Sequence, residues 1–245
     1  SLIENVDISN RIRFVDIKSN EDYLYEHQIN VCILSIYIGK KLRFKENKLQ
    51  KLAMASLICD YGNLLLNNEK YFSDELLNEK EKREFEKHTS LGYDFFHNET
   101  DFKITEILPA LEHHERIDGS GYPRGVCGDK IHLFSKIIAL VDVFDALTSD
   151  RPYRVQYSQS EAIEILLKGA GTLYDYDLTK LFTENIVMYP KGTKVLLSSN
   201  DIGIVTCQNK DSKESPNIIL MDKEYKKWIN LSKNKDIKII KVLKD

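Results

Sequence analysis

Long apolar segments and paired cysteines are both missing from this chain of 245 residues. No apolar run approaches the roughly 20 residues that cross a bilayer, and the polar start, SLIENVDISNRIRF, lacks the apolar core of a signal peptide. The four cysteines lie far apart and form no Cys-x-x-Cys motif. We therefore expect a cytoplasmic protein with reduced thiols and no membrane span. An upstream sensory segment stays open, because the sequence begins at Ser1.

An excess of positive charge is missing as well. The chain has 35 Lys and Arg against 38 Asp and Glu, which gives a net charge of −3 and a pI near 6.1. This balance argues against a nucleic-acid polymer as partner, so an anionic ligand has to be bound by local positive charge or by metal ions. With 42% hydrophobic residues, the chain can bury one substantial core and carry a small second domain.

Two different patterns of apolar residues follow one another along the chain. Apolar residues recur at steps of three and four up to about residue 188, which predicts helices over 22–44, 47–66, 104–115, 133–148, 160–168 and 177–188. Ser73, Leu76 and the charged run after Glu79 indicate a turn that enters a further helix, which continues through Phe96. The intervening segment 116–130 holds four glycines and a proline and is expected to be a loop. From residue 189 onward, short apolar runs are separated by Gly, Asn, Asp and Pro. We predict a mainly α fold with a helical domain over 1–189 and a small β-rich module over 190–245.

Two adjacent histidines, His113 and His114, end one of the predicted helices. Neighbouring helical residues point about 100° apart, so both rings reach one metal ion only where the chain bends. The glycine loop that follows supplies such a bend. An isolated pair of this kind more often consists of ordinary surface residues than of metal ligands. The motifs around the pair decide between these two possibilities.

The sequence HHERIDGSGYPRG, residues 113–125, resembles the HHE-x-x-DGxGYP signature of HD-GYP domains. The sequence VDVFDALTSDRPYR, residues 141–154, resembles the segment that follows it in that family. Two long motifs in the right order are highly specific, and the resemblance covers residues 26–188. It implies an HD-domain helical bundle and a metal-dependent phosphodiesterase that hydrolyses cyclic di-GMP to pGpG or GMP in bacterial second-messenger signalling.

The resemblance also implies a site for two divalent transition-metal ions, with Fe or Mn expected and Zn as an alternative. A carboxylate shared by both ions holds them close enough to activate one water and to bind a phosphodiester, which makes Asp60 the expected catalytic residue. The ligands implied for one ion are Asp60, His88, His113 and His114, and those for the other are His27, Asp60, Asp142 and the residue at position 59. Taken singly, each histidine is more often an ordinary interior or surface residue than a ligand.

The substrate side of the resemblance places Tyr122 and Pro123 on the loop that meets a guanine base. Arg151 and Arg154 match positions that contact the dinucleotide phosphates, a role that suits the planar guanidinium fork. An interhelix ion pair with Asp145 or Asp150 is the alternative for both arginines.

Three further residues are expected to support this loop rather than bind metal. Glu115 is expected to be a hydrogen-bonding partner of the site, and Asp118 is expected to brace the loop backbone. Gly119 and Gly121 are both expected to adopt positive φ.

One motif departs from the family pattern. Where typical members read HDIGK, this chain reads Cys59-Asp60-Tyr61-Gly62-Asn63. Cys59 is either a thiolate ligand or an inert buried thiol. Asn63 keeps the ability to hydrogen bond a substrate phosphate but lacks the lysine charge. Two functions stay open: a phosphodiesterase, or a catalytically impaired domain that senses cyclic di-GMP or docks signalling proteins or a second copy.

Overall fold

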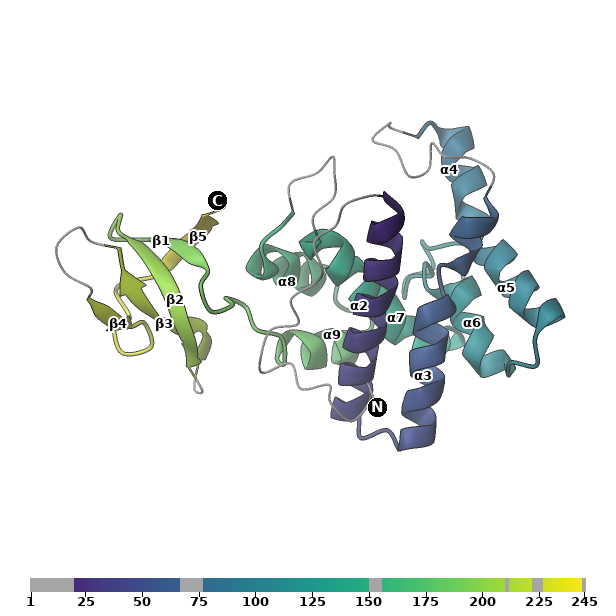
Figure 1. The fold of residues 1–245 in the computed structure, drawn as a ribbon, viewed down its shortest axis with the longest axis horizontal. Helices are drawn as coiled ribbons and strands as arrows, with labels where there is room; N and C mark the ends of the chain where they lie inside the picture. The colour runs from purple at the N-terminus through teal and green to yellow at the C-terminus, as the bar shows by residue number, and fades with distance from the viewer. Residues whose placement is uncertain (1–19, 67–76, 150–155, 210–211, 222–226, 244–245) are drawn as a thin grey trace. The chain divides into compact units, whose positions relative to one another are not determined.

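The computed structural model describes residues 20–66, 77–149, 156–209, 212–221 and 227–243 (Figure 1). The chain divides into two compact units, one made of residues 1–156 and 164–184 and the other of residues 157–163 and 185–245. Helices dominate the first unit and a single antiparallel sheet dominates the second. The predicted fold class, mainly α with a small β-rich module, is confirmed.

The helical elements follow one another from residue 20 to residue 183. They are α2 (Asn20–Lys41), α3 (Glu46–Ile58), the 3-10 helix η1 (Tyr61–Leu65), α4 (Glu79–Glu86), α5 (His88–Glu99), α6 (Ile104–Glu112), the 3-10 helix η3 (Gly128–Lys130), α7 (Leu133–Thr148), α8 (Gln159–Lys168) and α9 (Tyr176–Thr183). Helix α7 is apolar on most of its circumference and is accordingly buried, with α2, α6 and α9 packed around it.

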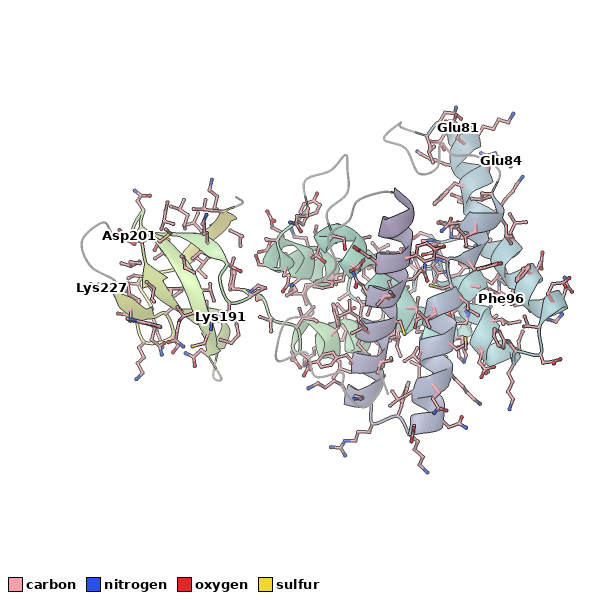
Figure 2. The ribbon with its side chains drawn as sticks, viewed as in Figure 1. Glu81, Glu84, Phe96, Lys191, Asp201 and Lys227 are labelled. Carbon is pink, nitrogen blue, oxygen red and sulfur yellow. The ribbon has the colours of Figure 1, made fainter. Side chains whose placement is uncertain are left out.

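A small apolar cluster fixes the helices that carry the site. Phe96 of α5, labelled in Figure 2, packs with Ile58 at the end of α3 and Ile107 of α6. Burying these side chains stabilises the junction of the three helices by about 1.5–3 kcal/mol for each large residue. The junction holds the end of α3, just before Asp60, against α5 and α6.

Three of the predicted helices differ in extent from the helices in the structure. The helix expected over 47–66 ends at Ile58 and gives way to η1, because Gly62 meets the backbone of α5 there. The single helix expected to continue through Phe96 is divided at Lys87 into α4 and α5, and the turn expected at Ser73 lies outside the described residues. Helix α9 ends at Thr183, five residues before the predicted end.

The sheet has five antiparallel strands in the order β4-β3-β2-β1-β5, seen in Figure 1. The strands are β1 (Lys194–Leu197), β2 (Ile202–Asn209), β3 (Ser212–Leu220), β4 (Trp228–Asn230) and β5 (Ile239–Leu243). One face carries the core of this unit, which consists of Val195, Leu197, Val205, Ile218, Ile229 and Leu231. Strand β4 was not predicted from the sequence, because three residues are too few to show an alternating pattern.

None of the helices in the described part of the chain combines the length and the apolar character that crossing a bilayer requires.

Candidate metal centre

The carboxylate of Asp60 lies at the centre of the candidate site. Helix α3 ends just before it, and the turn into η1 directs the side chain inward, where it is only one tenth exposed. Its Oδ1 lies 3.3 Å from His113 Nε2 and 3.5 Å from His88 Nε2. Its Oδ2 lies 3.7 Å from Nε2 of His27. One buried carboxylate thus faces three imidazoles from three helices.

His88 and His113 present their Nε2 atoms to that carboxylate in a fixed tautomer. His88 Nδ1 donates to the Phe85 carbonyl at 2.7 Å, and His113 Nδ1 donates to the Pro109 carbonyl at 2.8 Å. In the neutral form each Nε2 therefore carries a lone pair, and the two Nε2 atoms lie 3.5 Å apart. Burial lowers the pKa of His113, but the hydrogen bond and charge of Asp60 raise it overall, so a cation is favoured between the rings and the carboxylate. A proton on His113 meets that need in part, and the donor set also fits a transition-metal ion.

His114 completes the first group of potential ligands. One nitrogen or oxygen atom from each of Asp60, His88, His113 and His114 lies within 4.8 Å of the others. The ring of His114 stacks on Tyr122, with centroids 4.7 Å apart. Burial first, and then the charges of His113 and His88, hold the pKa of His114 well below its usual value. The imidazole is therefore neutral near pH 7, which is the form that binds metal.

The second group consists of His27, Asp60 and Asp142, again with ligand atoms within 4.8 Å of one another. His27 Nε2 lies 2.8 Å from Asp142 Oδ1, and His27 Nδ1 lies 2.7 Å from Asp145 Oδ2. Burial alone lowers the pKa of His27, but the hydrogen bonds and charges of Asp142 and Asp145 outweigh it and raise the pKa well above its usual value. Asp60 belongs to both groups, as the two-ion prediction requires.

Asp145 is a site residue that the sequence analysis considered only as an arginine partner. Its buried carboxylate accepts from His27, from Asn30 Nδ2 at 2.9 Å and from Ser149 Oγ at 3.1 Å. A carboxylate on Nδ1 fixes the ring orientation and makes Nε2 a better metal ligand. The signal was present in the sequence, because Asp145 follows Asp142 by three residues and so shares its helix face.

We expect Asp145→Asn to weaken one of the two metal sites selectively. The amide keeps the shape but removes the charge that makes His27 basic, so affinity for one ion should fall about ten- to hundredfold while the other is retained. Titration calorimetry with Mn²⁺ measures the two binding steps, one for each ion. Asp129→Asn, at a fully exposed position, is the matched control and should leave both steps unchanged. Equal loss at both sites would contradict a role confined to His27.

Cys59 belongs to neither group of potential ligands. Its buried thiol donates to the Ser56 carbonyl at 3.3 Å. Burial, together with the nearby charges of Asp60 and Asp142, raises the pKa of Cys59 well above its usual value, so the thiol stays protonated. The geometry favours the inert thiol of the two alternatives.

Two neutral amides hold the shared carboxylate of Asp60. Asn63 Nδ2 donates to Oδ1 at 3.0 Å, and Gln28 Nε2 donates to Oδ2 at 3.1 Å. The Oδ1 of Asn63 is buried and meets no hydrogen-bond donor among the described residues. Gln28 was not anticipated, since nothing in its sequence neighbourhood distinguishes it from a surface glutamine.

Buried glutamates anchor the glycine loop beside the site. Glu115 accepts from the backbone nitrogens of Arg124 and Val126, at 2.9 and 3.1 Å. Glu112, which the sequence analysis did not single out, accepts from the Arg124 guanidinium and from the backbone nitrogen of His132. Glu115 therefore supports the loop from within, and the loop carries Tyr122 with it.

The loop turns as expected at two of three positions. Asp118 Oδ1 accepts from Ser120 N at 2.9 Å, and Gly119 has a φ of +82°. The prediction of positive φ at Gly121 was wrong. A Cβ on Gly121 would lie 2.4–2.5 Å from backbone atoms of His114, Arg116 and Glu115, so close approach is what requires glycine there.

Of the residues predicted to contact the substrate, some lie within the described part of the chain and others do not. Tyr122 is partly buried against His114, and Pro123 is exposed beside it. Burial, and then the charges of Asp60 and Asp142, raise the pKa of Tyr122, so its phenol is neutral at any physiological pH. Arg151 and Arg154 lie outside the described residues, as does Asp150.

Residues 16–178 match a protein family described as the HD domain. The chain belongs to the HD domain family. The match covers the helical elements from α2 to α8 and both groups of potential metal ligands, so the predicted family resemblance is confirmed.

Curated relatives of this HD domain chain are named as phosphodiesterases. A cyclic di-GMP phosphodiesterase of Pseudomonas aeruginosa, PA4108, is 29% identical over 207 residues, which are 84% of this chain and 50% of the relative. The response regulator RpfG of Xanthomonas campestris, also named a cyclic di-GMP phosphodiesterase, is 34% identical over 56% of this chain and 37% of its own length. A 3'3'-cGAMP-specific phosphodiesterase of Vibrio cholerae is 37% identical over 62% of this chain and 35% of the relative. The chain spans half or less of the length of these relatives.

Two solved structures share the fold. The HDG"Y"P protein Bd1817 from Bdellovibrio bacteriovorus has a TM-score of 0.55 at 20% identity, over 66% of this chain and 51% of that protein. A cyclic GMP-AMP phosphodiesterase from V. cholerae has a TM-score of 0.52 at 21% identity, over 65% and 43%. At these identities the likeness shows the fold alone.

Proposed function

We propose that this chain is a metal-dependent phosphodiesterase that hydrolyses cyclic di-GMP to pGpG or GMP. The observation that carries the proposal is the pair of ligand groups that share Asp60, next to the loop that bears Tyr122. The printed names of PA4108 and RpfG support cyclic di-GMP as the substrate. We assign this activity to the helical domain, residues 1–189, and treat residues 190–245 as a separate module.

The proposed ions are Fe or Mn, with Zn as the alternative, because neutral imidazoles and carboxylates suit these metals. Asp60, His88, His113 and His114 would hold one ion, and His27, Asp60 and Asp142 the other. Bound there, the ions would neutralise phosphodiester charge and lower the pKa of an attacking water.

The chain's own residues position the reacting groups. Asp60 is ionised, because the hydrogen bond of His113 and the charges of His113, His88 and His27 outweigh burial, which by itself raises its pKa. Tyr122 stacks on the ring of His114 and so fixes its orientation, and the exposed Pro123 beside it would meet a guanine base of the substrate.

The substrate phosphates need separate contacts. Arg151 and Arg154 are proposed as phosphate contacts on the strength of the family motif. Asn63 offers its unpartnered buried Oδ1 to a donor on the substrate or to a water.

The decisive experiment measures turnover and binding together. Chain stripped of metal and then supplied with Mn²⁺ or Fe²⁺ should convert cyclic di-GMP to a linear product, followed by liquid chromatography. Metal-loaded chain that binds the dinucleotide without cutting it would replace the enzyme with a sensor. Failure to bind cyclic di-GMP at all would overturn both functions.

Placing the residues typical of HD-GYP domains at positions 59 and 63 should raise the turnover of cyclic di-GMP. Cys59→His adds a neutral nitrogen where the structure has a protonated thiol, and Asn63→Lys adds a positive charge beside Asp60. We expect the double variant to gain about tenfold or more in kcat, equivalent to about 1.4 kcal/mol of barrier, with little change in KM.

Steady-state kinetics of native chain, both single variants and the double variant measure this gain. Cys59→Ser is the control, because it replaces the thiol without adding a basic nitrogen. A native chain that already turns over rapidly, with no gain in the double variant, would show that Cys59 and Asn63 suffice.

A further inference from the structure

The sheet of the second unit has an apolar face on each side. In an antiparallel sheet, directly paired residues point to the same face. One row across the sheet is paired as Leu243, Lys194, Ile204, Ile219 and Trp228, and the next row contains Lys241, Leu196 and Ile202. Both rows lie on the side opposite the core, because the core residues Val195, Val205, Ile218 and Ile229 alternate with them along the strands.

Large apolar side chains on this outer face are open to solvent. Trp228 is 65% exposed, Met221 is 54% exposed and Ile202 is 42% exposed. Met221 joins the same face, because its backbone nitrogen donates to the Ile202 carbonyl and continues the pairing of β2 with β3. A sheet of this kind normally keeps one face polar, so a second apolar face marks an interaction surface.

The charge of this module indicates what covers the surface. Residues 190–245 contain twelve lysines and seven acidic residues, a net charge of +5, whereas the whole chain carries −3. Lys194 and Lys241 lie within the two apolar rows, and those rows contain no Asp or Glu. The partner of this face is therefore apolar in part and negatively charged.

We propose that the outer face of the sheet docks on the surface of an anionic lipid bilayer. Tryptophan and aliphatic side chains enter the headgroup region, while lysines beside them contact lipid phosphates. A second copy of the chain fits less well, because the two rows carry lysines and no Asp or Glu, so two such faces brought together would repel one another. The docking function is independent of the phosphodiesterase activity and would hold the helical unit near a membrane.

Trp228 is the only tryptophan in the chain, so its fluorescence reports on this face alone. The probe is a vesicle of phosphatidylcholine, with or without phosphatidylglycerol. With phosphatidylglycerol, the emission of the full chain should shift to the blue and acrylamide quenching should fall. Vesicles without phosphatidylglycerol should have little effect, and raised salt should reverse the binding.

Surface variants separate the apolar and charged contributions in vesicle sedimentation. The pair Ile202→Ser and Met221→Ser should weaken partitioning about tenfold or more. Lys241→Glu should weaken it at least about fivefold. Ile104→Ser is the matched control, because Ile104 is 51% exposed in the helical unit and should not affect partitioning.

Three outcomes would overturn the proposal. Blue-shifted, quench-protected emission without vesicles would mean that the chain itself or a second copy covers the face. Binding equal to neutral and anionic vesicles would remove the role of the lysines. Partitioning unchanged by the Ile202 and Met221 substitutions would place the contact elsewhere.

Discussion

Replacing Asp60 with asparagine should abolish phosphodiesterase activity and remove both metal ions. The carboxylate faces the Nε2 atoms of His88, His113 and His27 at 3.3–3.7 Å and belongs to both groups of potential ligands. An amide is neutral and leaves the converging lone pairs without their anion. We expect kcat to fall by about 10³-fold or more, equivalent to about 4 kcal/mol of barrier.

Metal content measured by plasma mass spectrometry distinguishes this loss from simple misfolding. Folded Asp60→Asn chain, checked by circular dichroism, should hold less than one ion, whereas native chain should hold two. Asp94→Asn, at an exposed position on α5, is the matched control and should keep both ions and full activity. Activity within tenfold of native in the Asp60 variant would show that the shared carboxylate is not part of the catalytic site.

The order of the helices could be predicted from the sequence, because their apolar stripes are long and regular. The end of α3 could not, since the chain leaves the helix at Cys59 for tertiary reasons. Asp60 has to turn inward toward imidazoles from α2, α5 and α6, and Gly62 has to meet the backbone of α5. The glycine at position 62 was the local signal for that change, and periodicity alone does not detect it.

The potential ligands other than Cys59 could be predicted residue by residue, because the two motifs carry His113, His114 and Asp142 and the family pattern assigns the other three. Their hydrogen-bonding partners could not, because these come from contacts between distant segments. Asp145 lies 118 residues from His27 in sequence, and Gln28 lies 32 residues from Asp60. A single sequence shows which polar side chains share a helix face. It does not show which buried group each of them hydrogen bonds. The outer face of the sheet was hidden for a similar reason, since only the strand register shows which residues share a side.

Gly62→Ala should destabilise the helical unit and disrupt the metal centre together. A Cβ at position 62 would lie 1.8 Å from the carbonyl oxygen of His88 and 2.8 Å from the backbone nitrogen of Gly92. Both are backbone atoms and no rotamer change can relieve the contact, so η1 and α5 have to move apart. Overpacking of this kind costs about 1–3 kcal/mol or more, which lowers Tm by about 5–10 °C in a domain of this size.

The same displacement moves His88 away from Asp60, so the metal centre should suffer more than the fold. Calorimetric unfolding gives Tm, and metal titration gives the affinity of the group that contains His88. Gly128→Ala is the matched control, because a Cβ there meets no atom within 4 Å and only the φ of +55° opposes it. That control should lose about 1 kcal/mol of stability and keep native metal affinity. If Gly62→Ala instead unfolds and binds metal like the native chain, the close contact between η1 and α5 does not set the position of His88.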